Sequence, residues 1–392
     1  MTKKYEQAQT MVRFFLLIAL VVGASLGVSS LWGGKPETMT SPGRLIITED
    51  MTVARFGQVN NLPDSLLKKI FRLSADADLD RKLSEFGNPD QIASTVAGKQ
   101  ALAAEQASKD WLKIRLKFVA WFVFLSFVFF YLRRRKLTPG LRIVLLGISV
   151  FVFGVVLGAD PGPMGTVKDA IHLYGTAHII FPPRMIALAV FLLLVFLANK
   201  YICAWGCQAG TLQELIFRLN TSERHEPRIG RRIKVPFVVT NTCRVLFFCV
   251  FVLCVFLGGV DIIAPIDPFR IFNPASLALV SGTFIAILLL LSLFMYRPWC
   301  HLFCPFGLAG WVVEKFSRVK INVDYQTCIA CRKCAAACPS TVMSAILYRN
   351  KKTIPDCFAC YTCRDVCPTQ SIRFSTDTRA LPPKGHFTND PR

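Results

Sequence analysis

The sequence predicts a mainly α-helical protein with six transmembrane helices, followed by a small C-terminal α+β domain built on a repeated cysteine motif. Two observations predict this fold class. The 392 residues are 53% hydrophobic and only 18% charged, with 32 phenylalanines, which is typical of membrane proteins rather than soluble globules. Near the C-terminus, eight of the 15 cysteines repeat one spacing twice, which indicates metal ligation rather than disulfides.

Six segments have the length and apolar composition of membrane helices. They cover roughly 11–32, 113–132, 141–159, 183–202, 236–258 and 276–296. The first begins with Lys3, Lys4 and Arg13, as a signal peptide would. Its apolar run is long, however, and no small-residue cleavage site follows it, so we interpret 1–33 as an uncleaved anchor.

Loop charges predict the orientation. The loop 132–142 carries five basic residues and no acidic one, and 208–234 carries six basic residues against three glutamates, whereas 34–110 holds ten basic and eleven acidic residues. Short basic loops stay in the cytoplasm. We therefore expect a multi-pass protein of the bacterial inner membrane with both termini and the cysteine-rich end cytoplasmic, and with 34–110 in the periplasm.

Five parts follow along the chain. They are an N-terminal anchor (1–33), a small helical periplasmic domain (34–110), a five-helix membrane domain (111–320), a cytoplasmic cysteine-rich domain (321–375) and a Pro-rich, polar tail (376–392). The formal net charge of +21 reflects the basic cytoplasmic loops and their attraction to anionic lipid, so we expect a lipid partner and no nucleic acid.

The cysteine runs have the spacing C-x2-C-x2-C-x3-C-P, which is that of two-cluster bacterial ferredoxins. Three closely spaced thiolates wrap one cubane, and the fourth reaches the other cluster. The predicted ligands of the first [4Fe–4S] cluster are Cys328, Cys331, Cys334 and Cys367, and those of the second are Cys357, Cys360, Cys363 and Cys338. Zinc is the alternative, but its sites usually consist of two separated CxxC pairs. We expect two [4Fe–4S] clusters.

Two further cysteine pairs lie 97 residues apart, each expected at the cytoplasmic end of a membrane helix: Cys203 with Cys207, and Cys300 with Cys304. Each follows a helix pair whose outer turn contains Asp-Pro, which suggests a duplicated two-helix unit. Positions i and i+4 share one helix face, so the two thiols of each pair could face the same group, such as a metal ion or cluster. Three interpretations remain open: a further metal or cluster, a redox-active dithiol, and buried structural cysteines.

His172 and His178 are expected in a loop at the outer end of the fourth helix. Histidine there could exchange protons with a quinol, although interfacial aromatic residues more often belong to the membrane belt.

The helices, the two C-x3-C motifs and the C-terminal cysteine runs together resemble the NapH- and NosR-type membrane polyferredoxins, over roughly 111–375. This resemblance implies electron transfer between the quinone pool and a partner reductase, or a role in metalloenzyme maturation. The chain departs from the pattern at Gln208, where the first motif lacks its proline. Segment 34–110 is too small and differently patterned to be the flavin domain of NosR-like proteins, so no covalent flavin is expected.

The leading hypothesis is an electron-transfer subunit that passes electrons between quinol, or another membrane donor, and partner redox subunits. The alternative is a copper reductase or metalloenzyme maturation factor; the exposed thiol pairs that it requires would favour it, and the lack of Met/His-rich copper-handling segments counts against it. A regulatory sensor that reads an outside signal through 34–110 is a third hypothesis.

Overall fold

The computed structural model describes residues 2–32, 45–48, 51–71, 73, 76–222, 226–348, 354, 356–383 and 385–387. Within these residues helices dominate, and one two-stranded sheet is present, so the mainly α prediction is confirmed. The expected boundary at 33–34, Arg224 of the basic loop and the end of the tail (388–392) lie outside the described residues.

Among the described residues, four helices are long and apolar enough to cross a membrane. They are α1 (Thr2–Trp32), α5 (Trp111–Arg133), α11 (Phe237–Gly258), and α6 (Pro139–Ser149) continued by the π-helical segment η3 (Val150–Val156). Their outer faces carry exposed apolar side chains, such as Phe122 at 76% and Val238 at 69%. Hydrocarbon chains would cover such surfaces, so the chain has the character of a membrane protein.

The fourth and sixth predicted membrane segments form shorter helices. These are α8 (Pro182–Ala198), with 17 residues, and α12 (Leu279–Leu291), with 13. A helix of 13 residues is about 20 Å long, against about 30 Å for the hydrocarbon core of a bilayer. Six spanning helices therefore remain a prediction.

Both short helices are followed by a break and two further helical pieces. After α8 come α9 (Tyr201–Trp205) and α10 (Gln208–Leu219), and after α12 come α13 (Pro298–Leu302) and α14 (Pro305–Glu314). The breaks contain left-handed residues, Asn199 (φ 62°) and Arg297 (φ 47°). The outer connection before α12 consists of the 3₁₀ turns η4 (Ala264–Ile266), η5 (Pro268–Phe272) and η6 (Pro274–Ser276).

Local capping explains where the membrane helices begin. Asp110 accepts hydrogen bonds from the backbone N–H groups of Leu112 and Lys113 at the start of α5. Thr138 does the same for Leu141 at the start of α6, where Pro139 occupies the first turn. The cap at Thr138 thus ends the basic turn between the two helices.

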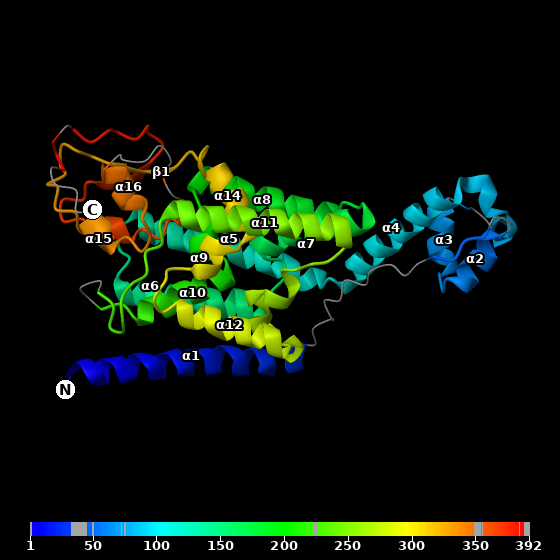
Figure 1. Ribbon diagram of the computed structural model, residues 1–392, viewed down its shortest axis with the longest axis horizontal. Coiled ribbons are helices and arrows are strands. Elements are labelled where there is room, and N and C mark those ends of the chain that lie inside the picture. The colour runs from blue at the N-terminus through cyan, green and yellow to red at the C-terminus, as the bar shows by residue number, and fades with distance from the viewer. Residues whose placement is uncertain are drawn as a thin grey trace.

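A small helical domain lies beyond one end of the bundle (Figure 1). It consists of α2 (Val53–Val59), α3 (Asp64–Phe71), the 3₁₀ turns η1 (Asp76–Asp80) and η2 (Leu83–Phe86), and α4 (Pro89–Ser108). Val53, Phe56, Leu67 and Val96 are fully buried in its core. The ion pair between Glu105 of α4 and Arg184 of α8, at 2.5 Å, joins it to the bundle near α7 (Pro163–Ala177).

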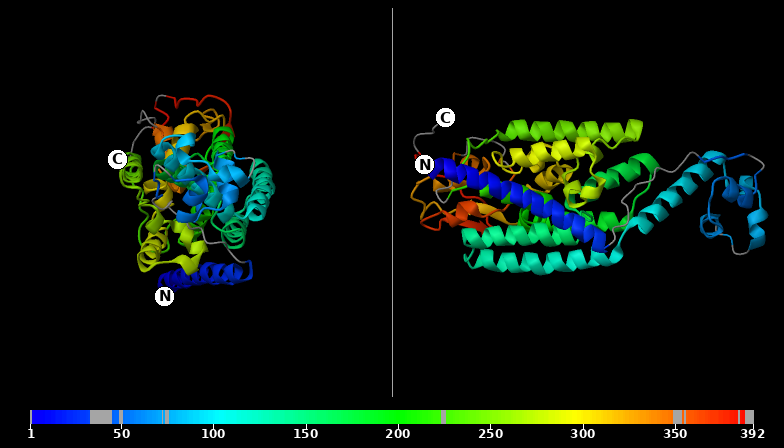
Figure 2. Two further views of the ribbon diagram at one scale, coloured as in Figure 1. Left: turned by 90° about the vertical axis from the view of Figure 1, so that its right-hand side faces the viewer. Right: turned by 90° about the horizontal axis from the view of Figure 1, so that it is seen from below.

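The C-terminal module, residues 320–375, lies at the opposite end. Strand β1 (Lys320–Val323) pairs antiparallel with β2 (Ile372–Ser375), so the two ends of the module meet. Between them are α15 (Lys333–Ala337), α16 (Val342–Tyr348) and α17 (Thr362–Asp365). The N-terminus of α1 lies at this same end of the molecule (Figure 2).

Candidate iron–sulfur sites

The predicted ligands of the second cluster surround a cavity in the C-terminal module. All four predicted ligands line it: Cys338, Cys357, Cys360 and Cys363. Three of them are buried, and Cys360 is half-buried. The backbone N–H of Ala359 donates to the sulfur of Cys357 at 3.4 Å. Such donors favour the thiolate form that metal ligation requires.

The cysteines of the first run also come together, but nearer to solvent. Burial raises the pKa of Cys334 to about 12, and charge on Cys367, Cys328 or Cys331 acts in the same direction. Cys331 itself is exposed. At Cys367, burial raises the pKa, but hydrogen bonds from the hydroxyl of Thr369 and from neighbouring backbone N–H groups outweigh it, so the pKa lies below its ordinary value.

The two runs share an unusual backbone conformation. The second and fourth residues after the first cysteine of each run have left-handed φ angles. They are Ala330 (54°) and Arg332 (57°) in the first run, and Ala359 (49°) and Tyr361 (63°) in the second. Left-handed residues are rare outside glycine and concentrate where the surroundings impose them, and successive turns of this kind aim N–H groups at an anion. Both loops therefore have a backbone suited to wrapping an anionic cluster.

In the part of the chain that the structure describes, no three His, Cys, Asp or Glu side chains are close enough to hold a single metal ion. A cubane is larger than one ion and separates its ligands further. The ligands of a cubane therefore need not lie as close together as those of a zinc ion.

A third group of cysteines lies inside the membrane domain, residues 111–318. Cys203 belongs to α9 and Cys300 to α13, while Cys207 and Cys304 are the N-caps of α10 and α14. All four are buried, with 7–9% of each residue exposed. Burial raises the pKa of Cys304 well above its ordinary value, and charge on any of the other three thiols raises it further. We call this group the four-cysteine site.

The expected placement of these pairs on one continuous helix was wrong. Each pair is divided between a five-residue helix and the cap of the next one, because a residue with extended backbone stands at Cys207 (φ −79°, ψ 112°) and at Cys304 (φ −65°, ψ 117°). The thiols consequently converge through the packing of four short helices rather than through i, i+4 spacing.

The C-terminal module contacts the four-cysteine site through the loop of its second run. Phe358 is 4% exposed and Ala359 is fully buried. The ring of Phe358 lies 4.9 Å from that of His301, the neighbour of Cys300. The indole of Trp205, in α9, donates to the carbonyl of Ala359 at 3.3 Å. The second run thus packs against both helices that carry the membrane cysteines.

Buried charges hold this contact together. The carboxylate of Asp356, which is 1% exposed, pairs with Lys200 at 2.5 Å and with Arg244 at 3.1 Å. Burial raises the pKa of Asp356, but these two cations outweigh it, and the pKa lies far below its ordinary value.

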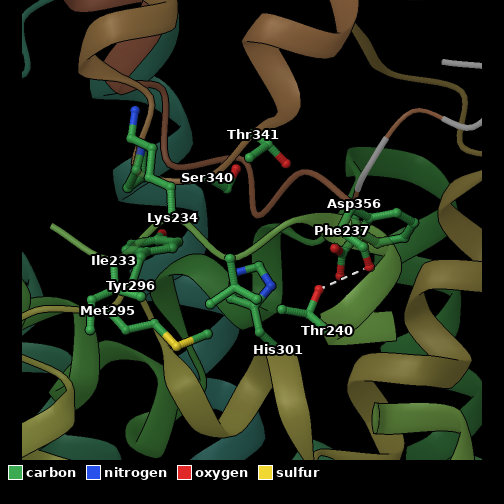
Figure 3. Close-up of a pocket in the computed structure, with 12 residues that line it drawn as sticks. Ile233, Lys234, Phe237, Thr240, Met295, Tyr296, His301, Ser340, Thr341 and Asp356 are labelled. Carbon is green, nitrogen blue, oxygen red and sulfur yellow. Dashed lines mark hydrogen bonds between the residues drawn. The ribbon is translucent and has the colours of Figure 1, made fainter. Parts of the chain in front are cut away.

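A second contact joins the same loop to the membrane domain: Arg142 donates to the carbonyl of Cys360 and pairs with Asp365. Figure 3 shows Asp356 of the module and His301 and Thr240 of the membrane domain around one pocket.

The two candidate quinone histidines have different surroundings. His172 lies within α7 and not in a loop as expected, and it is half-buried. His178 ends the same helix in a left-handed conformation (φ 52°), is exposed, and contacts Tyr174 edge-on.

The sequence analysis missed the buried cations Lys200, Arg244 and Arg297. A signal was present for two of them: Lys200 and Arg297 stand three residues before Cys203 and Cys300, at the same place in both copies of the repeat. No pattern singled out Arg244, which lies within the apolar helix α11.

Comparison with known proteins agrees with these sites. A family described as "4Fe-4S dicluster domain" matches residues 321–374, and one described as "4Fe-4S binding domain" matches 180–236 and 277–324. The chain thus contains ferredoxin-type 4Fe–4S domains. The second match covers both membrane cysteine pairs.

Three curated relatives share about half of the chain. The "Putative electron transport protein YccM" of Escherichia coli (strain K12) is 30% identical over 199 residues, which are 48% of this chain and 54% of that protein. The uncharacterized proteins MJ0749 and MJ0750 of Methanocaldococcus jannaschii are 23% and 24% identical, over 69% and 77% of their lengths. No solved structure matches. The chain spans about half the length of the first of these relatives.

Proposed function

We propose that the chain is a membrane-anchored electron-transfer subunit that passes electrons between membrane quinol and a partner redox protein. One observation carries this proposal: the second cysteine loop is buried against the helices of the four-cysteine site, whereas the first loop faces solvent. A route from the membrane to a soluble partner requires this order of sites.

The ligand sets proposed for the C-terminal module are those of the sequence analysis: Cys328, Cys331, Cys334 and Cys367 for one [4Fe–4S] cluster, and Cys357, Cys360, Cys363 and Cys338 for the other. When bound, such clusters supply reversible one-electron storage. The protein orients the thiolates with left-handed loops, supplies N–H donors to sulfur, and excludes water from the second set by packing Phe358 into the membrane domain.

We place both termini and the C-terminal module in the cytoplasm of a bacterium and 34–110 in the periplasm. The N-terminus and the C-terminal module share one end of the molecule, and the small helical domain occupies the other, as the loop charges require (Figure 1). Iron–sulfur ligands also suit a reducing compartment.

Quinol is the proposed donor because it is a lipid-soluble reductant that diffuses within the membrane. The four-cysteine site lies in the helix bundle whose outer face would contact the membrane lipid. A quinol delivers two electrons, whereas each cluster takes one, so several sites in series suit its oxidation. His172 and His178 remain the proposed proton acceptors.

The test uses the complete chain in lipid nanodiscs under anaerobic conditions. A reduced short-chain quinol is added, and bleaching of the visible iron–sulfur absorption is followed. We expect bleaching in the wild type and its slowing in His172→Ala and His178→Ala. Cys249→Ser, at an exposed position on α11, is the matched control and should behave as wild type. Chemical reduction without any reduction by quinol would contradict the proposed donor.

The copper-reductase alternative gains no support from the membrane cysteines. At 7–9% exposure they offer no thiol pair at the surface to a copper ion. Incubation of reduced protein with Cu(II) distinguishes the functions, since a copper reductase would reoxidise its clusters faster with Cu(II) than with a soluble redox partner.

A further inference from the structure

The membrane cysteines belong to two copies of one unit whose equivalent residues differ by 97. The units align Lys200 with Arg297, Cys203 with Cys300, Cys207 with Cys304, and Gly210 with Gly307. Their helices correspond as well: α9 with α13, and α10 with α14. The two halves therefore approach each other as related structures, and any site between them receives two cysteines from each.

The basic residue of each half reaches into the other half. Lys200, fully buried, donates to the carbonyl of Gly307 at 2.8 Å. Arg297, also fully buried, donates to the carbonyl of Cys203 and, at 2.9 Å, to that of Ala204. This exchange binds the cysteine segment of one half to the cation of the other. It holds the two cysteine pairs face to face by hydrogen bonds that are independent of the thiols.

The equivalent glycines show that the helices of both halves pack closely at the same place. A Cβ atom on Gly307 would lie 2.8 Å from the carbonyl oxygen of Cys300, and one on Gly210 would lie 3.0 Å from that of Cys203. Real Cβ atoms almost never approach so closely. Glycine therefore allows each of α10 and α14 to begin directly against the short helix that carries the preceding cysteine.

Two helix N-termini then meet at the four thiols. Cys207 and Cys304 cap α10 and α14, helices of 12 and 10 residues. The N–H of Gly307 donates to the sulfur of Cys304 at 3.3 Å. In the other half, the backbone N–H groups of Gly210 and Ala209 donate hydrogen bonds to the thiol of Cys207. The orphan N–H groups and positive ends of both helices stabilise negative charge at this point.

Local charge favours an anionic occupant. Lys200, Arg244 and Arg297 surround the site. Among the described residues they form ion pairs with two buried carboxylates, Asp356 and Glu214, and Glu214 also pairs with Arg218. A cation is thus left over for a negatively charged group, as four thiolates around a cluster would provide.

The site also faces the C-terminal module through one aromatic ring. Lys200 lies 5.1 Å and Arg297 5.3 Å from the centre of the Phe358 ring, so this ring sits between the exchanged cations of both halves. Phe358 follows the first cysteine of the second run directly. The four-cysteine site and the second run are therefore separated by one buried side chain.

We propose that Cys203, Cys207, Cys300 and Cys304 hold a third [4Fe–4S] cluster, and that the exchanged cations Lys200 and Arg297 raise its reduction potential. The third cluster would form the membrane end of the proposed electron route. This inference therefore deepens the proposed function and rests on it. The cations act by position, because a buried positive charge stabilises the reduced form, which carries one more negative charge.

The first experiment counts iron and sulfide in the complete, anaerobically purified chain. The wild type is expected to hold about twelve iron atoms, and the double variant Cys203→Ser/Cys300→Ser about eight. Cys249→Ser is the control and should keep all of them. About eight iron atoms in both the wild type and the double variant would overturn the proposal. The count needs neither quinol nor partner, so a third cluster without quinol oxidation would refute the donor alone.

The second experiment is a redox titration followed by electron paramagnetic resonance. In Arg297→Gln one signal, the one absent from the cysteine double variant, should shift to lower potential, and Arg297→Lys should restore it. If Arg297→Gln does not fold, Lys200→Gln tests the equivalent cation of the other half instead, because Asp356 keeps its ion pair with Arg244. A third cluster whose potential is the same in all these variants would overturn the role of the cations.

Discussion

The two cysteine runs of the C-terminal module have the same spacing and the same left-handed positions, yet they occupy opposite environments. The residue after the first cysteine is Ile329 in one run, 62% exposed, and Phe358 in the other, 4% exposed. The difference arises entirely from what each loop packs against. Two loops with the same ligand spacing can thus serve at different positions in one electron route, because solvent exposure changes the reduction potential of the cluster that each loop holds.

This comparison assigns the second run to the membrane and the first to the partner. Loss of a ligand of the second cluster should interrupt the route, whereas loss of a ligand of the first cluster should remove only its end. The following variants are arranged from the largest expected effect to the smallest.

Cys363→Ser should abolish reduction of the first run by quinol, because the connecting cluster is lost. Cys331→Ser should leave quinol-driven reduction of the second run intact while it stops delivery to a soluble acceptor. Anaerobic absorption and resonance spectra of the two variants in nanodiscs distinguish these outcomes. Equal loss of quinol-driven reduction in both variants would contradict the proposed order of the two clusters along the route.

Asp356→Asn should detach the second run from the membrane domain. The change leaves Lys200 and Arg244 buried without their carboxylate, a defect that costs about 3–5 kcal/mol. Limited proteolysis should then release the C-terminal module, and denaturant should unfold it earlier. Asp324→Asn is the control, because its partner Arg373 is 63% exposed, and surface pairs contribute about 0–1 kcal/mol.

Phe358→Leu and Ile329→Leu compare equivalent positions directly. The first should lower the free energy of unfolding of the module by about 1–2 kcal/mol, since it loses packing and the contacts of two cations with the ring. The second should change it by less than about 0.5 kcal/mol, as exposed substitutions usually do. Denaturant titration measures both, and equal effects would contradict the difference in burial.

Lys333→Glu should have the smallest effect. Lys333 is exposed in the first run, where a basic surface would attract an acidic partner. We expect slower delivery of electrons to an acidic soluble acceptor at low salt and an unchanged stability. The difference from wild type should disappear at high ionic strength, which stopped-flow measurements at two salt concentrations would reveal.

Much of the architecture was predictable because its signals are local. The spacing of the eight module cysteines predicted two loops of one kind, and their convergence on two sets agrees with this. The apolar runs predicted helices wherever the structure has the long ones. Helix ends were less accurate. Helix α8 stops at Ala198 because Asn199 has a positive φ angle, and α12 stops at Leu291, where the apolar run continues in turns.

By itself, the sequence determined the identity and spacing of the ligand candidates, the apolar helices and the duplication, because each depends on residues close together in the chain. Only the tertiary structure decided that the four membrane cysteines share one site and that Lys200 and Arg297 each bind the other half of the repeat. It also decided that one of the two loops with the same cysteine spacing is buried. These features join residues 93 to 156 positions apart. Their physical cause is packing and the pairing of buried charges, which no local pattern records.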